Sequence, residues 1–99
     1  MVFQYRLLYS ETSHRQIRKL HPALKTIVKS FIERIHENPY IGKRLEKELS
    51  GYFSFRTKRY RIIYKIDEDE SSIQIHYVGH RRDIYELFGE IIKKTEKRQ

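Results

Sequence analysis

The chain has 99 residues, a length typical of one domain, and we expect residues 1–99 to form a single unit. Hydrophobic residues make up 38% and charged residues 34%, which indicates a globular rather than a disordered protein. The absence of cysteine excludes disulfides and cysteine-based zinc sites. No apolar run approaches the roughly 20 residues of a membrane span, and no signal peptide opens the chain, so we expect a cytoplasmic protein without membrane contact.

The formal net charge is +8, from 21 lysine and arginine residues against 13 aspartate and glutamate residues. Such an excess favours polyanionic partners, which are RNA, DNA or an acidic protein. The alternative is a basic surface that serves only solubility, because net charge alone does not specify a function.

The chain opens with a predicted strand and a predicted short helix. Residues 2–9 are rich in strand formers and place aromatic and aliphatic side chains on one face at period two. Ser10 stands where a helix N-cap is expected, and Glu11 complements the helix dipole in the first turn. These signals predict a helix that ends near Leu20.

A second, longer helix is predicted to begin at Pro22, since proline is well suited to the first helical position. Asn38 and Pro39 end it. Its apolar residues recur at helical spacing and form one stripe: Leu24, Ile27, Val28, Phe31, Ile32 and Ile35. The tight joint at His21 predicts that the two helices are antiparallel and cover one face of a sheet.

Residues 39–50 are predicted to form a charged connector that Leu45 and Leu49 anchor. The rest of the chain predicts three strands and a terminal helix: residues 51–58, 59–66 and 72–79, with a turn at 67–71, and a helix from about Asp83 with an apolar stripe. The pattern as a whole predicts an α+β fold. It has a small antiparallel sheet of about four strands with a mixed edge, two N-terminal helices on one face and a C-terminal helix.

Alternation along the strands assigns their side chains to two faces. One face is apolar and is expected beneath the helices. The other face is expected to carry a basic set together: Arg56, Lys58, Arg61, His76 and His80. A half-polar face is normal for an antiparallel sheet, but an excess of arginine and histidine without acids is less so.

This basic face suits the cleavage of RNA without a metal, in which the 2′-hydroxyl of the RNA attacks the neighbouring phosphate. Arg56, Arg61 and Arg81 are candidates to stabilise the phosphate, because arginine stays charged and offers a planar fork to phosphate oxygens. His80 carries an imidazole that could move a proton, and Tyr85 could donate one or stack on a base.

Each candidate also has a structural interpretation. Arg61 could be an ordinary solvated residue, and Tyr85 could serve only packing. Further basic residues are expected to contact RNA: Lys43, Arg44, Lys58, Arg59 and Arg82. The sequence shows no metal-binding motif and no glycine-rich phosphate loop, so we expect neither a metal nor a cofactor.

The chain resembles the RelE/ParE toxin superfamily, and within it the RelE branch of bacterial type II toxin–antitoxin systems. The resemblance covers nearly the whole chain and is carried by short segments in a fixed order: Leu45, residues 49–52, Arg56, residues 60–64, residues 78–81, Ile84 and Tyr85. It implies a ribosome-associated endoribonuclease that cuts mRNA in the A site, beside ribosomal RNA, and so inhibits translation. It also implies a cognate antitoxin that neutralises the toxin.

The resemblance implies roles for individual residues. Arg61 and Arg81 match the phosphate-contacting arginines of the family, and Arg56 matches a basic strand residue that assists. Tyr85 matches a tyrosine near the C-terminus that stacks or protonates. His80 resembles the histidine that some branches use as general acid or base.

The chain departs from the family pattern in two places. Ser54 stands where RelE enzymes carry a second lysine, so the proton acceptor could instead be Glu46 or Glu48 of the connector. Lys58 and Arg59 replace the usual glycine and aspartate of a hairpin turn, which is costly where the turn needs positive φ. A longer or bulged turn is the alternative.

Two other functions compete with the nuclease. A ParE-like toxin uses the same fold to bind DNA gyrase without cutting RNA, but the presence of Arg61, Arg81 and Tyr85 favours the enzyme. A plain nucleic-acid-binding module would use the basic face only electrostatically, and its RNA binding would be salt-sensitive without cleavage. Without its antitoxin, we expect the protein to be a monomer.

Overall fold

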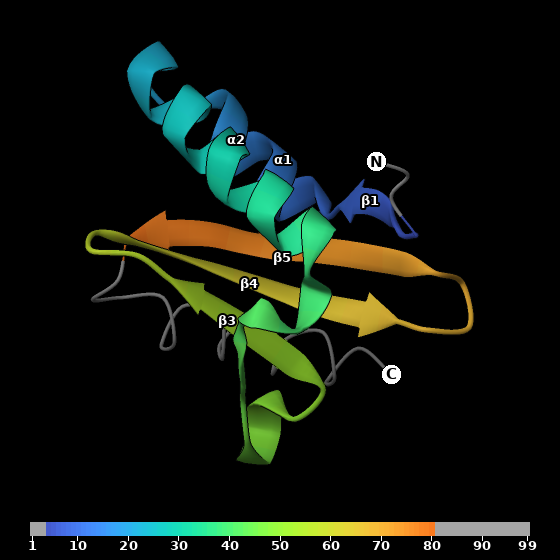
Figure 1. Cartoon of the computed structure of the whole chain (residues 1–99). Helices are drawn as coiled ribbons and strands as arrows, with labels where there is room; N and C mark the ends of the chain where they lie inside the picture. The colour runs from blue at the N-terminus through green and yellow to red at the C-terminus, as the bar shows by residue number, and fades with distance from the viewer. Residues whose placement is uncertain (1–3, 81–99) are drawn as a thin grey trace.

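The computed structural model of the chain describes residues 4–80; residues 1–3 and 81–99 are drawn in grey in Figure 1. The predicted C-terminal helix lies outside the described residues, as do Arg81, Arg82 and Tyr85. Within the described range, no helix combines the length and the apolar character needed to cross a membrane.

Both N-terminal helices form as the sequence predicts. Helix α1 spans Glu11–Arg18, and its N-cap is Ser10, whose Oγ accepts a hydrogen bond from the Ser13 amide at 3.0 Å. Helix α2 spans Pro22–Glu37 and begins with proline in its first turn. The capping residues therefore fix both helix starts.

The sheet has five strands in the order β1-β5-β4-β3-β2. The strands are β1 Arg6–Tyr9, β2 Lys43–Arg44, β3 Tyr52–Arg56, β4 Tyr60–Asp67 and β5 Ser72–His80. Strand β1 pairs parallel to β5, and all other pairs are antiparallel, which confirms the mixed sheet. The predicted count of four strands is wrong because β2 has only two residues and carries no apolar alternation.

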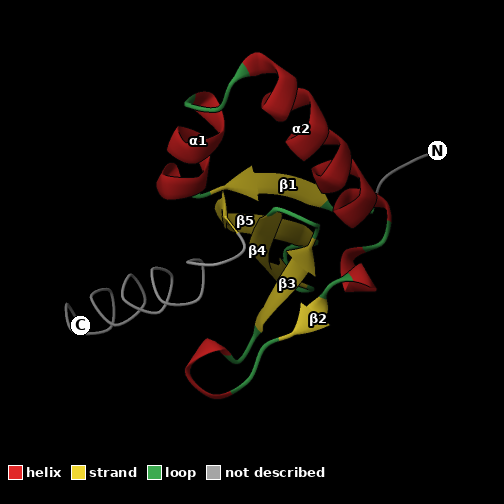
Figure 2. Ribbon diagram, turned by 90° about the vertical axis from the view of Figure 1, so that its left-hand side faces the viewer, coloured by secondary structure: helices red, strands yellow, loops and turns green. Residues whose placement is uncertain are grey.

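Helices α1 and α2 cover one face of the sheet, as both views show (Figures 1 and 2). The core lies between these layers and is made of helix and strand residues: Val28, Ile32, Ile35, Phe53, Phe55, Ile62, Tyr64, Ile73, Ile75 and Val78. Part of the predicted stripe of α2 provides its helix side, since Phe31 packs against the buried residues whereas Ile27 is exposed. Burial on this face is the main driving force that holds the fold together.

A second, smaller cluster packs on the face that the helices leave uncovered. It consists of buried Ile63 and Tyr77 with half-buried Leu45, Leu49 and Tyr52 against them. Leu45 and Leu49 come from the connector, which also contains two short 3-10 turns, η1 Pro39–Ile41 and η2 Lys47–Leu49. The prediction that these leucines anchor the connector is confirmed.

A bulge in β5 changes which side chains share a face. Ile63 pairs with Tyr77 whereas Tyr64 pairs with Ile75, so His76 is an extra residue in the ladder. Beyond the bulge the alternation is inverted, and His80 pairs with Tyr60 and lies 5.4 Å from it, ring centroid to centroid. The prediction that His80 shares a face with Arg61 is therefore wrong.

The β3–β4 hairpin turns through Lys58 and Arg59 without positive φ at either residue. Thr57 makes this possible, since its amide donates to the Tyr60 carbonyl at 2.9 Å and its Oγ1 accepts from the Tyr60 amide at 3.0 Å. Lys58 and Arg59 line a hollow with residues of α2, among them Leu24. Lys58 thus faces α2, and the prediction that it joins the arginine face is wrong.

Candidate functional site

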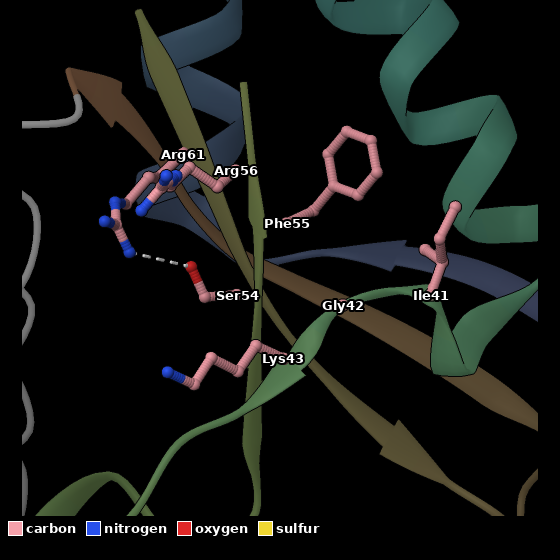
Figure 3. Close-up of a pocket in the computed structure, with 7 residues that line it drawn as sticks. All are labelled: Ile41, Gly42, Lys43, Ser54, Phe55, Arg56 and Arg61. Carbon is pink, nitrogen blue, oxygen red and sulfur yellow. Dashed lines mark hydrogen bonds between the residues drawn. The ribbon is translucent and has the colours of Figure 1, made fainter. Parts of the chain in front are cut away.

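An open groove of about 510 Å³ lies where β2, β3 and β4 run side by side (Figure 3). Its lining includes three cationic side chains and no carboxylate among the described residues: Ile41, Gly42, Lys43, Ser54, Phe55, Arg56 and Arg61. In Figure 3 the cationic side chains and Ser54 project to one side of the sheet, and Phe55 and Ile41 to the other. The groove therefore offers positive charge on the face away from the helices.

Arg56 and Arg61 are directly opposed across β3 and β4. Like charges at opposed positions repel each other and destabilise a sheet, so this pair is not explained by stability. Ser54 is almost fully buried, and Arg61 Nη1 donates to its hydroxyl at 3.5 Å. An anion between the two guanidinium groups would relieve their repulsion.

Lys43 joins the arginines through the register of β2. It pairs with Ser54, so its side chain starts from the same face as Ser54 and Arg56. The next residue, Arg44, pairs with Phe53, and its guanidinium carbon lies 5.8 Å from the centre of the Phe53 ring on the opposite face. Of these two predicted RNA-binding residues, the structure brings only Lys43 to the groove.

Gly79 pairs with Arg61 across β4 and β5, and it makes room for an aromatic side chain at this position. A Cβ atom at position 79 would lie 2.4 Å from Cε1 of Tyr77, so the Tyr77 ring lies over the glycine. Tyr77 is buried. This role of Gly79 was not predicted, although a glycine within a strand indicates close approach of another group.

The bulge residue His76 lies on the uncovered face, farther along β5. Its ring meets the Tyr52 ring edge-on at 5.2 Å, and its Nε2 lies 3.3 Å from Gln74 Oε1. Burial, and secondly the charge of Lys65, hold the pKa of His76 below its ordinary value. The prediction that His76 lies on this face is confirmed, but it does not line the groove.

The proton acceptor of the sequence analysis is not found at the groove. Glu46 and Glu48 stand at the start of and within η2, and neither lines the groove. Among the described residues, no group of three or more histidine, cysteine or acidic side chains could hold a metal ion. The predicted residues that do meet here are Lys43, Arg56 and Arg61.

A sequence model for the ParE toxins of type II toxin–antitoxin systems matches residues 7–85. The chain belongs to the RelE/ParE toxin superfamily. This RelE/ParE toxin is 36% identical over 83 residues to Toxin RelG of Mycobacterium tuberculosis, covering 82% of this chain and 95% of the relative. The family resemblance of the sequence is thereby confirmed.

Solved structures of the superfamily share the fold of this RelE/ParE toxin. The RelBE2 toxin–antitoxin complex of Mycobacterium tuberculosis contains a chain that superposes with a TM-score of 0.72 at 34% identity, covering 79% of this chain and 99% of that one. The isolated RelE toxin of Escherichia coli superposes with a TM-score of 0.69, covering 89% and 98%. At 20% identity, it supports the fold alone.

Proposed function

We propose that this type II toxin is a ribosome-dependent endoribonuclease that cleaves mRNA in the A site and so inhibits translation. The observation that carries the proposal is the opposed pair Arg56 and Arg61 in a groove that the described residues line without any carboxylate. Cations fixed by a rigid sheet can stabilise an anion whose negative charge grows during a reaction.

The reaction that this site supports is transesterification within the RNA. The 2′-oxygen attacks the adjacent phosphorus, the bond from phosphorus to the 5′-oxygen breaks, and the products are a 2′,3′-cyclic phosphate and a 5′-hydroxyl. One proton leaves the 2′-hydroxyl and one reaches the departing 5′-oxygen. Arg56 and Arg61 stabilise the extra negative charge on the phosphate oxygens, with Lys43 as a further cation.

Other residues of the sequence analysis keep proposed roles. Arg81 as a further phosphate-binding group and Tyr85 as a stacking or proton-donating group lie outside the described residues, as does Arg82 as an RNA contact. A proton-transfer role for His80 requires access from the Tyr60 face of the sheet, since the bulge turns it away from Arg61.

We propose two classes of partner for this toxin. The first is mRNA on the ribosome, which the basic groove suits by charge. The second is a cognate antitoxin, supported by likeness to the RelBE2 toxin–antitoxin complex at 34% identity. The toxin acts only when it is free of that antitoxin.

Primer extension on a defined mRNA in a translating extract tests this function. We expect the wild type to produce cuts at codon positions and Arg61→Ala to lower the cleavage rate by about 10² to 10³, the usual cost of one donor to a transition-state anion. Arg18→Ala, which removes an exposed cation from α1, is the matched control and should cleave like the wild type. Cuts that persist in Arg61→Ala would refute the arginine mechanism.

The match to the ParE sequence model supports a second candidate, a toxin that binds DNA gyrase. A supercoiling assay separates the two functions. Inhibition of gyrase by the wild type, together with undisturbed mRNA in the extract, would establish the second candidate and overturn the first.

A further inference from the structure

Tyr64 carries a buried hydroxyl that the proposed reaction does not use. The residue lies on the helix-covered face of β4 and is fully buried, and its ring stacks on Phe53 with the centroids 5.5 Å apart. Burial raises the pKa of Tyr64 to about 12, so the hydroxyl keeps its proton at neutral pH. It can therefore donate one hydrogen bond and accept another.

Both hydrogen bonds of this hydroxyl go to the backbone that joins η1 to β2. The Tyr64 hydroxyl donates to the Pro39 carbonyl at 2.7 Å, and the Gly42 amide donates to the Tyr64 hydroxyl at 3.0 Å. A Cβ atom at Gly42 would lie 2.5 Å from that oxygen and 3.1 Å from the Ser54 carbonyl. The backbone passes so close to the hydroxyl that no side chain fits at position 42.

The residue after Gly42 is Lys43, which supplies a cation to the groove (Figure 3). It belongs to a strand of only two residues, so few ladder hydrogen bonds fix its place. The bonds of Tyr64 to Pro39 and Gly42 hold the segment directly before it. Lys43 therefore directly follows a backbone segment that is bonded to a hydroxyl buried on the opposite face of the sheet.

We propose that Tyr64 is a positioning residue of the RNA site: its hydroxyl fixes Gly42 so that Lys43 is held beside Arg56 and Arg61 to contact a phosphate of the RNA. The inference rests on the proposed function for its ligand. Tyr64 acts through the backbone and does not touch the RNA. Position 54 is a serine and supplies no charge, whereas Lys43, its partner in β2, supplies a cation.

The salt dependence of RNA binding tests this role. Affinity for a short single-stranded RNA oligonucleotide is measured against salt for the wild type, Lys43→Ala, Tyr64→Phe and the double variant. Each lost phosphate contact lowers the slope of log affinity against log salt by about 0.7 on single strands. We expect that decrease in either single variant and no further decrease in the double variant, because both changes remove the same contact.

Tyr40→Phe is the matched control. Like Tyr64→Phe, this variant removes one tyrosine hydroxyl. The hydroxyl of Tyr40 belongs to the connector and donates to Glu68 Oε1 at 2.6 Å, and its removal leaves the bonds of Tyr64 intact. The salt slope of this variant should equal that of the wild type. A folded but merely less stable protein keeps its phosphate contacts, so its slope does not change.

Three results would overturn the proposal: a wild-type slope in folded Tyr64→Phe, a wild-type slope in Lys43→Ala, or additive losses in the double variant. If Tyr64→Phe does not fold, Gly42→Ala disturbs the contact between Gly42 and the Tyr64 hydroxyl from the connector side. A wild-type salt slope in Gly42→Ala would also overturn the proposal. A wild type that binds RNA but cuts no mRNA would refute the nuclease, while the slopes would still decide the role of Tyr64.

Discussion

The two faces of the sheet differ in what they bury and in what they display. The face under α1 and α2 holds nearly the whole core, including fully buried Ile62. Among residues 4–80, the uncovered face holds the small cluster around Ile63 and Tyr77, and beside it the groove with Arg56 and Arg61. Arg61 and Ile62 are neighbours in one strand, but Arg61 lines the groove on one face and Ile62 is buried in the core on the other.

The two faces thus separate residues that stabilise the folded state from residues that destabilise it. Burial of Ile62 removes apolar surface from water and stabilises the protein. The opposition of Arg56 and Arg61 does the reverse, because like charges across a ladder repel. On the uncovered face, stability alone therefore does not account for the opposed pair Arg56 and Arg61.

The largest change in stability is expected for Ile62→Ala. Ile62 is fully buried, and truncation of such a residue leaves a cavity and costs about 2–5 kcal/mol. Arg61→Ala, one residue away on the other face, should change the free energy of unfolding by less than about 1 kcal/mol. Urea denaturation of both variants measures the difference, and equal losses would contradict the division of the two faces.

Gly79→Ala is expected to have an intermediate effect. Its methyl group would lie 2.4 Å from Cε1 of the buried Tyr77 ring, so the ring must move, and such overpacking costs about 1–3 kcal/mol. This outweighs the roughly 0.5–1 kcal/mol that alanine normally gains over glycine within a strand. Urea denaturation measures the net loss.

A double-variant cycle sharpens the test of Gly79. In the background Tyr77→Ala the clashing ring is absent, and Gly79→Ala should then be neutral or stabilising. If Gly79→Ala costs the same free energy with and without the ring, contact with Tyr77 is not the reason for the glycine.

Much of the fold could be predicted from the sequence because its signals are local. Ser10 as N-cap and Pro22 in the first turn of α2 each act over a few residues, and both appear as predicted. The apolar stripe of α2 is confirmed in part, because Val28, Ile32 and Ile35 are buried whereas Ile27 is exposed. Strand β2 could not be predicted in the same way. Two basic residues carry no alternation, and their pairing depends on the distant Ser54 and Phe53.

The candidate site was predicted only in part, for the same physical reason. Arg56 and Arg61 share a face because alternation along β3 and β4 is regular. The assignment of His80 failed since alternation does not reveal a bulge, and one extra residue at His76 inverts every later position of β5. The bonds of the Tyr64 hydroxyl to the connector could not be predicted, because they join residues far apart in the sequence.

The smallest effect is expected from the protonation of His76 on the uncovered face. Burial and nearby Lys65 hold the folded-state pKa of His76 below the value of about 6.5 that it has when unfolded. The unfolded state therefore binds the proton first as pH falls. The contribution of His76 to stability is complete above about pH 6.5 and is lost as pH decreases through that value toward the lower folded pKa.

His76→Gln removes this dependence, so its free energy of unfolding should fall less between pH 7 and pH 5 than that of the wild type. Lys65, Tyr52 and Gln74 surround the ring and are unchanged in the variant. His14→Gln, on the exposed surface of α1, should keep the wild-type dependence. Urea denaturation at a series of pH values measures all three proteins. If the free energy of unfolding falls as much with pH in His76→Gln as in the wild type, burial of His76 at the bulge is not the source of the pH dependence.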